Sequence, residues 1–211
     1  MYQPLQSLSA NRAIAIPARA CETLIMEGEP CNGILELRCG LVRAVNFSSE
    51  GNRQIMAFFF PGDLLGLPLA DEHRFSAEAV SDVIYTKQSI RTWEADLAAC
   101  HSPSGCSPLR AIWQEEKAFM ARGLILGRGA VMARLAAFLA YAVRRLPVEN
   151  GAYDFSVPQS DVASFIATSP ETVCRLMRQL REMRVIKTPR KNRLEILDAQ
   201  RLEALANGVS I

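Results

Sequence analysis

The stretch Pro158–Ile186, PQSDVASFIATSPETVCRLMRQLREMRVI, predicts two helices joined by a tight turn. Its second helix begins with Ser169-Pro170-Glu171, which supplies an N-cap hydroxyl, a proline where no amide donor is needed and an acid in the first turn. Four apolar residues then recur at intervals of three or four and predict a buried face: Val173, Leu176, Met177 and Leu180. The order helix, turn, amphipathic helix indicates a helix-turn-helix.

The exposed face of the second helix carries side chains suited to reading DNA. Glu171 and Arg175 are four residues apart and therefore lie side by side near the helix start. Glutamate can accept from cytosine N4, and arginine can donate to guanine O6 and N7. The predicted DNA contacts of this helix are Ser169, Glu171, Thr172, Cys174, Arg175 and Arg178. The alternative interpretation is an ordinary surface helix whose arginines are solvated.

A basic segment follows this helix and favours the DNA interpretation. Residues 187–193 contain four cations and lie between the apolar runs Val185-Ile186 and Leu194-Glu195-Ile196. Two short strands around a Pro/Asn turn would form a hairpin, or wing, that can lie along a phosphate backbone. Lys191 and Arg193 are the predicted contacts of this wing.

Charge is distributed unevenly along the 211 residues. Residues 128–211 hold 13 Lys and Arg against 8 Asp and Glu, whereas residues 1–127 hold 11 against 14. The positive excess therefore lies with the helix-turn-helix, where binding of a polyanion needs it. No apolar run approaches the length of a membrane span, and the N-terminus lacks the order of a signal peptide. We therefore expect a cytoplasmic protein with no membrane partner.

The first half of the chain predicts a β domain. Short apolar runs alternate with turn signals about every 8–12 residues, and strands are expected at Ile34–Leu37, Leu41–Val45 and Ile55–Phe60. Many short antiparallel strands indicate a sandwich or barrel. A long helix with a broad apolar stripe is expected from Leu109 to about Leu126, and the break Gly127–Gly129 is the expected domain boundary.

This order of parts resembles the CRP/FNR family of bacterial transcription regulators, and most closely its FNR/FixK branch. The motifs that carry the resemblance are PGDLLG at 61–66, RFSAEA at 74–79, LGR at 126–128, ARLAAFL at 133–139 and ETVCR at 171–175. The resemblance implies an α+β fold with an N-terminal jelly-roll β domain of the cyclic-nucleotide-binding type. The expected organisation is a leader over residues 1–17, the β domain over 18–107, a dimerisation helix over 108–127 and a winged helix-turn-helix domain over 128–211.

The resemblance also implies a function. A homodimer would bind a palindromic promoter site in double-stranded DNA and would contact RNA polymerase through loops at 148–153 and 48–54. In FNR-type members, a Glu, a Ser and an Arg of the recognition helix read a TTGAT-like half-site. Glu171 and Arg175 match that set, and Cys174 replaces the serine. Ala167 replaces the usual turn glycine, with a steric penalty if its φ is positive.

Cys174 also motivates a redox hypothesis. Neighbouring guanidinium groups and the helix N-terminus would favour its thiolate, and oxidation to a sulfinate or sulfonate would place a negative charge against DNA. The simpler alternative is that Cys174 touches a thymine methyl group where relatives use serine.

We expect DNA binding that is independent of cyclic nucleotide. Family members that bind a cyclic nucleotide carry a glutamate for the ribose and an arginine for the phosphate. Leu67 and Phe75 stand at those two positions here, and Arg74 is one residue removed, which points it to the other face of a strand. A phosphate pocket needs its cation.

The sequence predicts no cofactor, no metal site and no catalysis. Cys21, Cys31 and Cys39 are ten and eight residues apart, wider than iron–sulfur motifs. Cys100, His101 and Cys106 are one ligand short of a closed zinc site. The chain has neither a Gly-rich phosphate loop nor a nucleophile motif. The alternative that stays open is a small-molecule, haem or redox sensor whose DNA binding depends on an effector; its histidines are His73 and His101.

Overall fold

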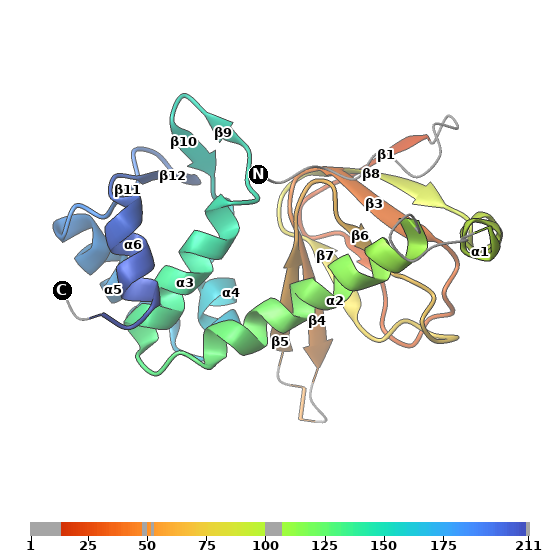
Figure 1. Cartoon of the computed structure of the whole chain (residues 1–211), viewed down its shortest axis with the longest axis horizontal. Coiled ribbons are helices and arrows are strands. Elements are labelled where there is room, and N and C mark those ends of the chain that lie inside the picture. Colours follow the sequence, from red (N-terminus) through yellow and green to blue (C-terminus); the bar gives the residue numbers. More distant parts are fainter. Residues whose placement is uncertain (1–13, 48–49, 52, 100–106, 210–211) are drawn as a thin grey trace. The chain divides into compact units, whose positions relative to one another are not determined.

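The computed structural model describes residues 14–47, 50, 51, 53–99 and 107–209. The chain forms two compact units, Met1–Phe119 and Met120–Ile211. Their division falls inside the long helix α2 (Ser107–Leu126), upstream of the glycine break at 127–129 where the sequence placed the boundary. Figure 1 shows the order of the elements along the chain.

The first unit contains two four-stranded antiparallel sheets. In one, the strand order is β1-β8-β3-β6, formed by Ala15–Ala18, Val83–Gln88, Ile34–Cys39 and Leu64–Leu65. In the other, the order is β2-β7-β4-β5, formed by Thr23–Ile25, Ser76–Ala79, Val42–Phe47 and Arg53–Phe59. The three predicted strands are confirmed as β3, β4 and β5, with ends shifted by one or two residues. A short helix, α1 (Ile90–Ala98), follows β8.

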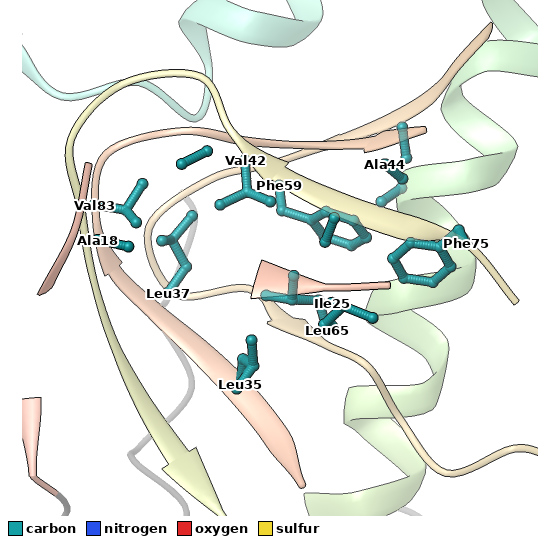
Figure 2. Packing of buried hydrophobic residues seen from close by; sticks show 14 residues of the cluster. Ala18, Ile25, Leu35, Leu37, Val42, Ala44, Phe59, Leu65, Phe75 and Val83 are labelled. Carbon is teal, nitrogen blue, oxygen red and sulfur yellow. The ribbon is translucent and has the colours of Figure 1, made fainter. Parts of the chain in front are cut away.

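Both sheets send alternate side chains into one hydrophobic core, as the two-residue period of a strand requires (Figure 2). Phe59 of β5 stacks on Phe75, with ring centroids 6.0 Å apart. Phe119 of α2 meets Phe75 edge to face at 5.1 Å. This end of α2 is therefore packed on the β domain through aromatic contacts, which stabilise beyond the area they bury.

Strand β1 corrects the leader predicted over residues 1–17. Residues Ala15–Ala18 pair with β8 in antiparallel register, from Ala15 opposite Thr86 to Ala18 opposite Val83. Pro17 has no amide donor, and the edge position of β1 tolerates that loss. Residues 1–13 lie outside the described part of the chain.

The second unit combines helices with a small sheet of order β11-β12-β10-β9, formed by Ile186–Lys187, Arg193–Ile196, Ala152–Asp154 and Val148–Glu149. Helix α3 (Val131–Val143) packs against α6 (Ala199–Ala206). The predicted helix-turn-helix is confirmed as α4 (Gln159–Phe165) and α5 (Pro170–Glu182). Phe138 of α3 joins them to the core, with its ring centroid 5.3 Å from that of Phe165.

None of the helices in the described residues is both long enough and apolar enough to span a lipid bilayer.

Candidate nucleic-acid interface

The turn that leads into α5 is closed by an alanine in the left-handed region. Ala167 has a φ of 52°. The Thr168 amide donates to the Ala163 carbonyl at 2.9 Å, and the Ala167 amide donates to the Ser164 carbonyl at 3.4 Å. These are the two hydrogen bonds of a Schellman motif. The steric penalty that the sequence suggested for an alanine at this position therefore applies.

Two arginines hold the end of α4 in place. Arg134 of α3 donates through Nη1 to the carbonyls of Ile166 at 2.9 Å and Ala167 at 3.3 Å. Arg122 of α2 donates through Nε to the Phe165 carbonyl at 3.2 Å. Carbonyls at a helix end lack partners within the helix, so these guanidinium groups fix the turn and with it the start of α5. Sequence reasoning missed both residues.

Helix α5 has the cap and the two faces that the sequence predicted. The Ser169 hydroxyl accepts from the Thr172 amide at 3.2 Å, and the two hydroxyl groups also lie 3.2 Å apart. The four predicted core residues are all buried. The opposite face exposes the remaining predicted contacts: Glu171, Cys174, Arg175 and Arg178.

The exposed face is prepared for polar contacts. The carboxylate of Glu171 accepts hydrogen bonds from the Glu171 backbone amide and from the Ser169 hydroxyl, and these lower its pKa. This carboxylate is therefore an ionised acceptor at neutral pH. Within the described part of the chain, no carboxylate forms an ion pair with Arg175 or Arg178. An ionised acceptor and unpaired guanidinium donors therefore stand together on one side of the helix.

The wing residues differ in how free they are. Lys191 lies exposed in the turn between β11 and β12. Arg193 instead forms an ion pair with Glu149 of β9, at 2.6 Å between Nη2 and Oε2, which raises the pKa of the guanidinium. Lys187 pairs with Glu195 across the two strands at 3.2 Å. Of the two predicted wing contacts, Lys191 is the more available for a phosphate.

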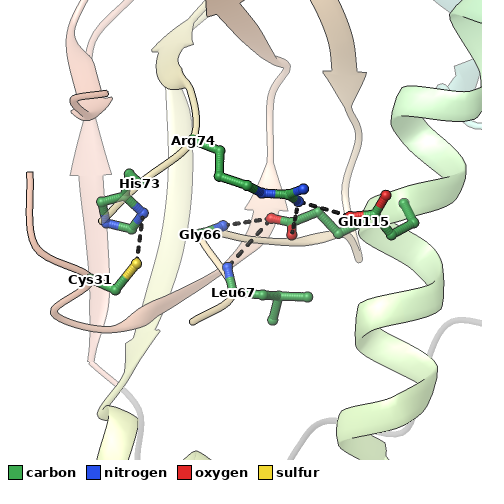
Figure 3. Close-up of polar contacts among 7 residues, drawn as sticks. Cys31, Gly66, Leu67, His73, Arg74 and Glu115 are labelled. Carbon is green, nitrogen blue, oxygen red and sulfur yellow. Dashed lines mark hydrogen bonds and ion pairs between the residues drawn. The ribbon is translucent and has the colours of Figure 1, made fainter. Parts of the chain in front are cut away.

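In the β domain, buried hydrophobic side chains stand at the two positions where a ribose-binding glutamate and a phosphate-binding arginine would be expected. Leu67 is 5% exposed and packs in a cluster with Trp93 of α1 and Ala111 of α2. Phe75 is 4% exposed and belongs to the core between the sheets. Arg74 points to the surface side, where its Nη2 lies 2.8 Å from a carboxylate oxygen of Glu116 (Figure 3). Neither hydrophobic side chain can bind a ribose or a phosphate.

The described residues contain no group of three His, Cys, Asp or Glu side chains that could hold a metal ion. Cys21 and Cys39 are exposed free thiols, and the Cys31 Sγ lies 3.4 Å from Nδ1 of His73 (Figure 3). Burial raises the pKa of Cys31 and lowers the pKa of His73, which favours the uncharged form of each. Residues 100–106, with the predicted cysteines and histidine of that loop, lie outside the described residues.

Two family models match the chain. The cyclic nucleotide-binding domain matches residues 16–87, and the Crp-like helix-turn-helix domain matches residues 133–205. Among curated relatives, the nitrogen fixation regulation protein FixK of Azorhizobium caulinodans is 29% identical, over 96% of this chain and 83% of its own length. The transcriptional activatory protein AadR of Rhodopseudomonas palustris is 28% identical, over 88% and 78%.

A solved structure agrees with these matches. FixK2 from Bradyrhizobium japonicum superposes with a TM-score of 0.83 at 28% identity, covering 92% of this chain and 96% of that one. The predicted fold class, a β domain of the cyclic-nucleotide-binding type followed by a helix-turn-helix domain, is thereby confirmed.

Proposed function

The chain belongs to the CRP/FNR family of transcription regulators, and on that premise we propose that it acts as a cytoplasmic homodimer on a TTGAT-N4-ATCAA-like palindrome, without cyclic nucleotide. It is a regulator with a DNA-binding helix-turn-helix and is not an enzyme. One observation carries the proposal: α5 is capped at Ser169, buried along one face, and exposes Glu171 and Arg175 on the other.

Base recognition follows from the chemistry of that face. In the major groove, the Glu171 carboxylate can accept from a cytosine N4 amino group, and Arg175 can donate to O6 and N7 of a guanine. Both lie in the N-terminal half of α5, the part of a recognition helix that meets base edges. The TTGAT assignment itself comes from the match of these two residues to the FNR branch. Cys174 replaces the serine of that branch, so the preference for the outer base of the half-site should differ from that of FNR-type members.

The remaining contacts position the domain on the phosphate backbone. Ser169 and Thr172 lie at the N-terminus of α5, where backbone amides and hydroxyl groups suit a phosphate oxygen. Arg178 and Lys191 supply exposed positive charge. Arg193 contributes charge while tied to Glu149, so its share in binding should be smaller than that of Lys191.

A second copy of the chain supplies the other half-site. Helix α2 exposes Leu109, Trp113, Met120 and Leu124, with exposed fractions of 42%, 58%, 51% and 69%. Their spacing of four, seven and four residues places them along one side of the helix, as an exposed apolar stripe that a second helix can cover. A palindrome needs two recognition helices related by a two-fold axis. Trp113→Asp should therefore give a monomer in analytical ultracentrifugation, whereas Glu94→Asp on α1 should leave the dimer intact.

Contact with RNA polymerase is proposed for the hairpin β9–β10 and the β4–β5 turn. The hairpin turns at Asn150 and Gly151, with φ values of 52° and 78°, and carries the exposed Val148. Residues 48, 49 and 52 of the β4–β5 turn lie outside the described part of the chain. A relative of this chain is named as a transcriptional activator, and we propose activation as the outcome here too.

The test of base reading compares two arginines. Arg175→Ala should weaken binding to the palindrome by about 1–3 kcal/mol per half-site and relax the preference at one G·C pair. Arg144→Ala removes the same charge from a site where the arginine pairs with Glu203, and should keep the sequence preference. A competition mobility-shift assay measures both. Retention of full sequence preference by Arg175→Ala would show that α5 is not the reading helix.

A further inference from the structure

A buried carboxylate on α2 reaches into the β domain. The Glu115 side chain is 1% exposed. Its Oε1 accepts hydrogen bonds from two successive backbone amides, those of Gly66 at 2.9 Å and Leu67 at 3.4 Å (Figure 3). The three residues belong to the same compact unit, although Glu115 lies 49 positions after Gly66 and 48 after Leu67 in the sequence.

The turn after β6 has the geometry of an anion site. Gly66 has a φ of 76°, and a Cβ there would lie 2.7 Å from the Ile25 side chain and 3.3 Å from the His73 ring. Only glycine therefore lets the chain turn so that two consecutive amides converge on one oxygen. Amides arranged in this way form a concavity that binds anions, and carboxylates are good acceptors for such donors.

A cation stands at the rim of this site. Nη2 of Arg74 lies 3.8 Å from Oε2 of Glu115 and 2.8 Å from Oε1 of Glu116. The Arg74 side chain is 48% exposed, so it closes the site from the solvent side and is shared between the two carboxylates. Its contact with Glu115 is the looser one, which leaves the two amides as the main partners of the buried group.

The same turn lies within the residues that match the cyclic nucleotide-binding domain. We propose that the Gly66–Leu67 turn is a binding site for a carboxyl group and that its ligand is the chain's own Glu115. The side chain occupies the amide donors that a diffusible anion would otherwise need, and it attaches α2 to the β domain from within. This contact has a consequence for regulation, which rests on the proposed function: Glu115 holds the effector domain in its working arrangement without a small molecule.

The hydrophobic surroundings fit a resident side chain better than a nucleotide. Leu67 packs beside Trp93 and Ala111, and Ala118 of α2 lies in the core between the sheets. Ala111, Glu115 and Ala118 recur at intervals of four and three, so they form one buried stripe of α2 with the carboxylate in its middle. Small residues on either side let the helix approach the turn closely.

The experiment replaces the resident ligand by a free one. Glu115→Ala removes a group with the size and charge of acetate, and leaves the two amides and Arg74 in place. In the full-length variant at about pH 5, where part of each acid is protonated, sodium acetate or formate should raise the thermal midpoint saturably, by about 3 °C or more relative to chloride at equal pH and ionic strength. Wild type and Glu115→Gln, whose acceptor oxygen still fills the site, should show no such difference. Glu116→Ala is the matched control and should behave as wild type.

Equal responses of all four proteins to acetate and formate would overturn the proposal. If Glu115→Ala folds only poorly, its refolding yield in acetate against chloride decides the question in the same way. The readout needs no DNA, so its result is separate from the test of base reading. A protein that fails to bind the palindrome but shows acetate binding in Glu115→Ala alone would refute the proposed function and leave this site standing.

Discussion

The buried Glu115 should make the stability of the first unit depend on pH. Burial raises the pKa of this carboxyl from 4.5 to about 7, against the opposing effect of the two amides and Arg74. The folded state then binds the proton more tightly than the unfolded chain. The stability that the neutral carboxyl supports is complete below pH 4.5 and is lost as the pH rises through about 7.

The neutral variant Glu115→Gln isolates this effect. One pKa unit corresponds to about 1.4 kcal/mol, so the full rise from 4.5 to about 7 amounts to at most about 3.5 kcal/mol. Glutamine keeps an acceptor for the Gly66 and Leu67 amides and does not titrate. The free energy of unfolding of the variant relative to wild type should therefore increase by up to about 3 kcal/mol between about pH 5 and pH 8.5.

Tryptophan fluorescence in urea is the suitable assay. The chain has two tryptophans, Trp93 and Trp113, and both belong to the first unit, so their signal follows the unit that contains Glu115. Glu116→Gln changes the neighbouring exposed carboxylate and serves as the control. Burial lowers the pKa of His73 and raises that of Cys31, and both groups are present in wild type and in the variant, so the comparison isolates Glu115. Parallel pH profiles for wild type and Glu115→Gln would refute the reasoning.

Further predictions concern the turn, the wing and the thiol of the second unit. Ala167→Gly should stabilise by roughly 0.5–1 kcal/mol in chemical denaturation, because relief of the left-handed strain exceeds the added chain entropy; a loss of stability would contradict the strain argument. Lys191→Ala should weaken binding to all DNA sequences alike and reduce the slope of log K against log salt concentration by about one, as anisotropy titrations at several salt concentrations would show. Arg193→Ala should have a smaller effect on both. Peroxide should reduce DNA binding of wild type but not of Cys174→Ser if the exposed thiol is redox-sensitive; equal responses would make Cys174 a contact residue only.

Local signals in the sequence were enough for most elements. Helix α5 could be placed because a cap, a proline and a helical period coincide at Ser169–Glu171, and all three act within a few residues. The strands β3, β4 and β5 could be placed because glycine and proline turns separate them. The left-handed turn at Ala167 could be anticipated only through the family resemblance, since alanine itself gives no such signal.

Contacts between distant residues could not be predicted in this way. Strand β1 exists because of its register with β8, some 65 or more positions later. Glu115 stands in the run Gln114–Lys117, which looks like a solvated helix face, and its burial follows from a turn at Gly66. The pairing of Arg193 with Glu149 likewise joins residues 44 positions apart. In each case the tertiary fold determines the partner, and no periodicity in the local sequence indicates it.

The proposed function depends on sequence-specific DNA binding by the unmodified chain. The most direct measurement is a fluorescence anisotropy titration of the full-length protein with a TTGAT-N4-ATCAA duplex, beside a duplex of the same composition with both half-sites scrambled, at one stated salt concentration and without cyclic nucleotide. We predict binding to the palindrome at least about a thousandfold tighter than to the scrambled duplex, with two chains per duplex. Equal affinity for the two duplexes, or preference that emerges only on addition of cyclic AMP, would contradict it.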